Sequence, residues 1–284
     1  MSSAARSASS TKSWEGGMYT LLLGASAINL GANLIADVTT PAPPVDLCLD
    51  SPPTVQLAAW LQNLLVFSKS LLVPALAGIL YLSTRGKASS IRRGAFYVAL
   101  FFCWMGDIAL LFSDKNKLFF QLGLCSFGVA HLFFIGSYFL VRNWGGLMQW
   151  KSSYVLPFIV YGYTLYSIIY HQLALCPGKP GNELMALAVA GYMVVLLANG
   201  VTSCLRLGAK NMPSSGSLLV GVVLFVQSDS IIAVTEFVNT LPLERFAIMA
   251  TYILGLFLMV RGCILDTQEC APQQAEEQPA RLAA

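Results

Sequence analysis

Charged side chains are scarce in this sequence, and their scarcity excludes an ordinary soluble fold. Only 11% of the 284 residues are Asp, Glu, Lys or Arg, whereas 56% are hydrophobic, and the mean hydropathy is +0.66. A soluble domain averages about 25% charged residues. One soluble core could not bury this much apolar surface, so a lipid bilayer is expected around much of the chain. The net charge of +3 is too small to indicate a nucleic-acid partner.

Histidine is also rare, which excludes several familiar enzyme classes. The two histidines are His131 and His171, so a zinc site built on three His is impossible, and a site completed by carboxylates would need both. The sequence contains no Gly-x-Ser-x-Gly segment, no phosphate-binding loop and no dinucleotide-binding fingerprint. Ser68, Ser228 and Ser230 have no His plainly placed to activate them, so nucleophilic serine chemistry is disfavoured.

Long apolar segments dominate the rest of the chain. A membrane-spanning helix needs about 20 mainly apolar residues. Eight segments meet or approach that length: residues 18–36, 61–82, 94–112, 118–141, 154–170, 183–205, 217–237 and 242–265. We therefore predict an all-α, polytopic membrane bundle of about eight transmembrane helices. Residues 18–265 would form the transmembrane domain, and the polar ends, 1–17 and 266–284, would be disordered tails.

Lys and Arg in the connecting segments predict the orientation, because cytosolic loops are enriched in basic residues. With eight spans, twelve basic residues lie on the side of the two chain ends: Arg6, Lys12, Arg85, Lys87, Arg92, Arg93, Arg142, Lys151, Arg206, Lys210, Arg261 and Arg281. Four lie on the other side: Lys115, Lys117, Lys179 and Arg245. A model with seven spans would place basic residues of both sets on the same side of the membrane. Both termini are therefore predicted to be cytosolic.

Two of the seven cysteines, Cys48 and Cys176, fall in segments predicted to be non-cytosolic. That side is oxidising in the secretory pathway, so the two could form a disulfide. Two free thiols are the equally weighted alternative, because cysteine pairing is not readable from sequence. The endoplasmic reticulum is the default membrane for a eukaryotic chain without a targeting tag.

Ionisable groups inside the predicted spans are few. They are costly in a bilayer and usually mark a site or seek a partner. At about 1.5 Å of rise per residue, Lys69, Asp107, Asp229 and Tyr252 share a layer roughly 9–15 Å below the outer surface. His131 is expected to lie deeper, at about 20 Å. Two carboxyl groups at one depth suit acid–base chemistry. Polar contacts that only hold helices together are the structural alternative.

Four short segments around these residues carry a resemblance to a known family. Residues 102–111 read FCWMGDIALL, 128–135 read GVAHLFFI, 224–232 read LFVQSDSII, and Thr251-Tyr252 follow in the last span. In this order and spacing they resemble the lysoplasmalogenase, or YhhN-like, family of integral membrane proteins, over roughly residues 60–262. The chain departs from the family at Ser70, where Pro usually follows the Lys, and near Leu256, where a Gln is usual.

The resemblance implies hydrolysis of the vinyl ether bond of lysoplasmalogens, which are lysophospholipids. The products would be a fatty aldehyde and glycerophosphoethanolamine or glycerophosphocholine. Such cleavage needs a proton donor, a nearby negative charge and a base for water, which two carboxylates can supply without a metal or other cofactor. On this reading Asp107 and Asp229 are the catalytic acid–base pair. Supporting or substrate-binding roles go to Lys69, His131, Ser228 and Tyr252.

Two other function classes stay open at this point. A small transporter or proton-coupled carrier would also use buried carboxylates and a lysine, although no inverted repeat or pair of broken helices is evident. A receptor or scaffold would need only structural polar contacts. Headgroup preference, chain-length preference, the identity of the proton donor and the oligomeric state are not readable from the sequence.

Overall fold

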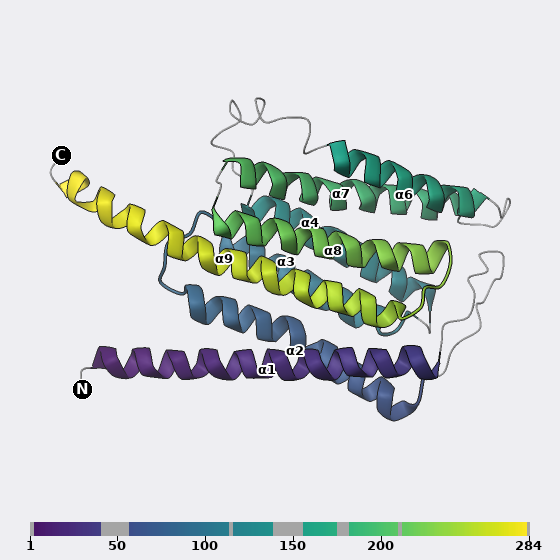
Figure 1. Ribbon diagram of the computed structural model, residues 1–284, viewed down its shortest axis with the longest axis horizontal. Coiled ribbons are helices and arrows are strands. Elements are labelled where there is room, and N and C mark those ends of the chain that lie inside the picture. Colours follow the sequence, from purple (N-terminus) through teal and green to yellow (C-terminus); the bar gives the residue numbers. More distant parts are fainter. Residues whose placement is uncertain are drawn as a thin grey trace.

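The computed structural model describes residues 3–40, 57–113, 116–138, 156–174, 182–209 and 212–282. Over these ranges it is a bundle of eight long helices with no strand (Figure 1). The helices are α1 Ser3–Thr39, α2 Ala59–Thr84, α3 Arg93–Leu110, α4 Lys117–Tyr138, α6 Leu156–Ala174, α7 Asn182–Ala209, α8 Pro213–Phe237 and α9 Glu244–Leu282. The predicted all-helical membrane fold is thus confirmed, and each helix overlaps one predicted span.

Seven of the eight helices are long and apolar enough to cross a membrane. The eighth helix, α6, lies along α7, and its axis is roughly parallel to the axes of its neighbours (Figure 1). Its sequence is less hydrophobic because it contains four tyrosines, a histidine and a glutamine: Tyr161, Tyr163, Tyr166, Tyr170, His171 and Gln172. The chain is therefore an integral membrane protein with seven strongly apolar helices and an eighth, more polar one.

Helices reach into both of the segments expected to be tails. Helix α1 begins at Ser3 and α9 continues to Leu282. The start of α1 and the end of α9 lie at the same end of the bundle (Figure 1), as an even number of crossings requires. The assignment of that end to the cytosol, and the division into one domain and two tails, stay predictions.

Helices α8 and α9 approach each other closely because glycines face each other across them. A Cβ on Gly221 would lie 2.7 Å from the carbonyl oxygen of Gly255, and a Cβ on Gly255 would lie 2.9 Å from that of Gly221. Small residues allow such backbone contact between membrane helices. Ser228 adds a link, since its hydroxyl donates to the carbonyl of Ile248 at 3.1 Å. The pair thus forms a rigid wall of the bundle.

Helix α1 is attached to α2 and α9 by polar contacts. Asn29 Nδ2 donates to Ser68 Oγ at 2.9 Å, and Asn33 Nδ2 donates to Asn29 Oδ1 at 2.9 Å. At the end of α1, the Asp37 carboxylate accepts from the backbone N–H of Phe246 at 2.9 Å and lies 3.5 Å from Arg245 Nη1. A carboxylate at a helix N-terminus is favourable because it satisfies unpaired N–H groups there. The asparagines that make the first span unusually polar are thus paired in the structure.

Candidate active site

Asp107 lies near the end of α3, three residues before Leu110, and is buried. Its Oδ2 accepts a hydrogen bond from Tyr252 Oη of α9 at 2.7 Å. Its Oδ1 lies 4.0 Å from Lys69 Nζ of α2. The preceding residue is Gly106, and a larger residue would not fit there, because a Cβ would lie 2.7 Å from the ring of Phe127 on α4. Three helices therefore supply the surroundings of this carboxyl group.

A proline in α2 helps to join Lys69 to α3. Pro74 has no N–H, so the carbonyl of Ser70, four residues earlier, loses its helical hydrogen bond. Trp104 Nε1 of α3 donates to that carbonyl at 3.1 Å. A backbone carbonyl at membrane depth needs such a partner. This contact fixes the turn of α2 that begins one residue after Lys69.

Asp229 on α8 is the centre of a second polar group. Its Oδ2 accepts from Tyr192 Oη of α7 at 2.5 Å and lies 3.3 Å from His131 Nε2 of α4. Asn199 Nδ2, also of α7, lies 2.9 Å from His131 Nδ1. With the amide nitrogen donating, Nδ1 must accept, so the imidazole proton is on Nε2 and points to Asp229. Asn199 thereby orients His131, and His131 and Tyr192 together orient Asp229.

One aromatic ring contacts both polar groups, the one around Asp107 and the one around Asp229. The Phe225 ring packs edge-on against His131, with centroids 4.7 Å apart, and against Tyr252, with centroids 5.3 Å apart. Phe225 is therefore in contact with a partner of each Asp.

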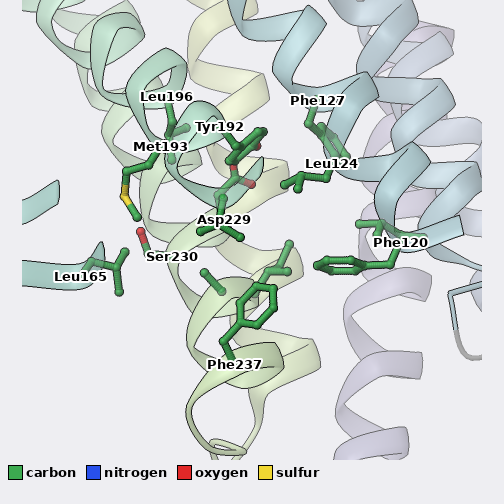
Figure 2. Close-up of a pocket in the computed structure, with 14 residues that line it drawn as sticks. Phe120, Leu124, Phe127, Leu165, Tyr192, Met193, Leu196, Asp229, Ser230 and Phe237 are labelled. Atoms are coloured by element: carbon green, nitrogen blue, oxygen red, sulfur yellow. The ribbon is translucent and has the colours of Figure 1, made fainter. Parts of the chain in front are cut away.

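The Asp229 side of the site opens into a pocket. This partly open pocket lies among α3, α4, α6, α7 and α8 (Figure 2). Its polar groups come from Asp229, Tyr192 and Ser230. The rest of its wall is aliphatic or aromatic: Leu110, Phe120, Leu124, Phe127, Leu165, Val189, Met193, Leu196, Ile232, Ala233 and Phe237. A carboxyl group therefore faces an otherwise apolar space.

The structure brings most of the predicted site residues together. Lys69 and Tyr252 lie at Asp107, and His131 lies at Asp229 rather than in a deeper layer, since it contacts that carboxylate directly. Ser228 does not join them, because its hydroxyl bonds the Ile248 carbonyl on α9. The predicted Cys48–Cys176 disulfide lies outside the described residues.

Sequence reasoning missed two site residues on α7. Tyr192 and Asn199 are seven residues apart and so lie on the same helix face. Asn199 is fully buried in an apolar helix, and a buried amide in a span signals a polar partner. That signal was present in the sequence. Tyr192 gave no such signal, because tyrosine is common in this sequence, which contains eleven.

The arrangement provides two carboxyl groups, each with a tyrosine hydroxyl donating to it, plus one ammonium and one imidazole. Such groups can deliver a proton, take one up and stabilise a passing cation. Among the residues the structure describes, no three His, Cys, Asp or Glu side chains are grouped as metal ligands. The chemistry these residues suggest is acid–base hydrolysis.

Comparisons with known proteins show which family the chain belongs to. The model of the YhhN family matches residues 64–263, which include every site residue named above but not α1. Two relatives, lysoplasmalogenase TMEM86B of Mus musculus and of Rattus norvegicus, are each 30% identical over 160 residues. The alignment covers 56% of this chain but only 59% and 57% of those relatives. No solved structure matches the chain. Because the family match spans well over half of its length, the chain belongs to the YhhN family.

Proposed function

We propose that this protein is a membrane-embedded hydrolase that cleaves the vinyl ether bond of lysoplasmalogens. The observation that carries the proposal is the pair of buried carboxyl groups, each held by a tyrosine, in the family of proteins that includes the lysoplasmalogenase relatives. The products are a fatty aldehyde and glycerophosphoethanolamine or glycerophosphocholine. The substrate is a lysophospholipid that reaches the site from the bilayer, and the chemistry needs no cofactor.

The reaction balances with water as the only co-reactant. A proton adds to the vinyl carbon farther from the ether oxygen, and the carbon next to the oxygen becomes an oxocarbenium ion. Water attacks that carbon and gives up a proton, which forms a hemiacetal. The hemiacetal then breaks its bond to the glycerol oxygen, which takes a proton, and releases the aldehyde. The enzyme must therefore supply one proton early, accept one later, and stabilise the cation between these steps.

The geometry supports a different catalytic role for each of the two carboxyl groups. Asp229 lines the apolar pocket, where the alkenyl group would lie, so it is placed to protonate the vinyl carbon. Asp107 lies beside the Lys69 ammonium on the other side of the aromatic rings. There it is placed to accept the proton of the attacking water, while Lys69 contacts the substrate phosphate. His131 and Tyr192 orient the donor, and Tyr252 orients the base.

The first test is aldehyde release from lysoplasmalogen by purified protein, with Asp107→Asn and Asp229→Asn alongside. Both variants should lose turnover by at least about 100-fold, the usual effect of removing a general acid or base. Asp37→Asn is the matched control, because the Asp37 side chain is only 4% exposed and lies outside the site. Full activity in both site variants would refute the mechanism. Flux of substrate into sealed vesicles without cleavage would instead support the carrier alternative.

A second test shows which carbon the water attacks. Hydrolysis in water labelled with oxygen-18 should leave the glycerophospho product unlabelled and place the label on the aldehyde, if the aldehyde is trapped at once by reduction to the alcohol. Label on the glycerophospho product would show that the bond between the glycerol carbon and the ether oxygen breaks, and would refute attack of water at the vinyl carbon.

The location of the enzyme is part of the proposal. We assign it to the endoplasmic reticulum membrane with both chain ends in the cytosol, because basic residues are concentrated at that end of the bundle. Epitope tags at both termini should be accessible to antibody after the plasma membrane alone is permeabilised. A tag that needs permeabilisation of the internal membrane would contradict this orientation.

A further inference from the structure

The pocket at Asp229 extends beyond the groups that take part in the proposed catalytic steps. Its lining is almost entirely aliphatic or aromatic, as is typical of sites that bind small apolar molecules. It is built from five helices, so its wall does not depend on a single loop or helix end. Four of them are among the strongly apolar helices. A ligand of this pocket would therefore come from the bilayer rather than from water.

The polar and apolar groups of the pocket are separated along its length. Asp229 and Phe237 both line it and are eight residues apart on α8, or about 12 Å along the helix. At the Phe237 end, that ring packs edge-on against Phe120 of α4, with centroids 6.2 Å apart. Figure 2 shows Phe237 below Asp229, and the Phe120 ring pointing into the pocket from the right. The space between these two ends is walled by aliphatic side chains such as Val189 and Ala233.

We propose that this pocket binds the hydrocarbon chain of a single-chain ether lipid, and that the Phe120–Phe237 pair limits the chain length accepted. The inference rests on the proposed function, since it places the bond to be cleaved at Asp229 and the alkyl chain along the apolar wall. The chain runs from Asp229 toward Phe237. The glycerophosphate end then lies toward Lys69 and Asp107, across the Phe127 and Phe225 rings.

Two observations favour this occupant over others. The wall offers no polar partner beyond Asp229, Tyr192 and Ser230, so a sugar, nucleotide or peptide would leave its own polar groups unpaired, which is costly. The single carboxyl group at one end matches a ligand whose only reactive bond lies at the end of a long apolar chain. A chain bound here would bring its first double bond to Asp229 without further rearrangement.

The experiment compares two valine substitutions on the same helix. Val189 lines the pocket and is buried, whereas Val194 is 67% exposed on the outer face of α7. Val189→Phe should fill the pocket, and Val194→Phe should not. The ligand is radiolabelled dodecyl ether lysophosphatidylcholine, whose saturated ether bond cannot be cleaved. Its binding to wild type and variants in nanodiscs is measured by scintillation proximity.

The expected result is a loss of affinity of about tenfold or more in Val189→Phe and a change below about twofold in Val194→Phe. A third variant, Phe237→Ala, should shift preference from dodecyl toward octadecyl chains, because it removes one ring of the closing pair. Equal binding by both valine variants, or an unchanged chain preference in Phe237→Ala, would overturn the pocket assignment. Binding that follows these expectations, in a protein that releases no aldehyde, would refute the proposed hydrolysis but not the chain pocket.

Discussion

Each carboxyl group of the site is oriented by a tyrosine hydroxyl on a different helix. Tyr252 donates to Asp107 at 2.7 Å and Tyr192 donates to Asp229 at 2.5 Å. The second neighbour of each carboxyl group is different: Asp107 lies near an ammonium group and Asp229 near an imidazole. The tyrosines therefore act on the reaction through the carboxylates, and removal of a hydroxyl should affect catalysis more than folding.

We predict that Tyr192→Phe and Tyr252→Phe each lower kcat for aldehyde release by about 10- to 100-fold, because the carboxyl group loses its orienting donor. KM should change little, since the aromatic ring and its packing remain. The control is Tyr163→Phe on α6, whose side chain is exposed and outside the site. Unchanged kcat in both site variants would show that the tyrosines serve packing alone.

Two substitutions of His131 test whether it acts as a hydrogen-bond donor to Asp229. Its Nε2 is 3.3 Å from Asp229, and Asn199 binds its other ring nitrogen. His131→Gln keeps an N–H donor of similar reach, whereas His131→Leu keeps only the volume. Kinetics of aldehyde release should show the Gln variant at least about tenfold more active than the Leu variant, because a donor to Asp229 is retained. Equal activity of the two would contradict the donor role.

The sequence allowed part of this site to be predicted, for a physical reason. Charged residues are so rare in the spans that Lys69, Asp107 and Asp229 stand out, and any pairing among them is favoured in lipid. The contact between His131 and Asp229 was not predictable, because its position depends on how far α4 is displaced along α8. Tyr192 was missed because a tyrosine in a span is ordinary until its partner is known.

At the scale of helices, the apolar length of each segment predicted where the helices lie but not how they meet. α8 and α9 are the example, since their spans were predicted from hydropathy while the Gly221–Gly255 contact was not. Hydropathy measures preference for lipid, whereas helix contacts depend on small residues that face each other. Hydropathy also gave no reason to extend α9 to Leu282.

The glycines of α8 offer a matched pair of substitutions. A Cβ on Gly221 would lie 2.7 Å from a backbone oxygen of α9, which cannot move without separating the helices, whereas a Cβ on Gly216 meets nothing within 4 Å. We predict that Gly221→Ala costs about 1–3 kcal/mol of stability. Gly216→Ala should be neutral or stabilise by about 0.5–1 kcal/mol, because alanine favours the helix. Thermal unfolding in detergent measures both, and equal melting temperatures would contradict the close approach.

Across the whole molecule, ionic contacts hold both ends of the bundle while the site lies between them. At one end Asp37 joins α1 to α9. At the end where α1 starts, Arg206 of α7 and Asp266 of α9 form an ion pair of 2.9 Å, and both side chains are almost fully buried. Asp266 also accepts from the hydroxyls of Ser89 and Ser90 in the α2–α3 connection, at 2.8 and 2.5 Å. One carboxylate thus connects α7, α9 and the segment between the two helices that carry Lys69 and Asp107.

Loss of this carboxylate should therefore weaken the assembly as a whole rather than the chemistry. Asp266→Leu leaves Arg206 with the Tyr138 carbonyl and Ser90 hydroxyl as its remaining partners, and a buried charge deprived of its partner costs about 3–5 kcal/mol. The double variant with Arg206→Met removes the stranded charge and should recover part of that loss. Melting temperature in detergent is the measurement, with the exposed Lys87→Met as control. Because Asp266 lies fourteen residues from Tyr252 on α9, about 21 Å along the helix, any protein that stays folded should retain its kcat. A double variant less stable than Asp266→Leu alone would show that Arg206 stabilises the bundle independently of the ion pair.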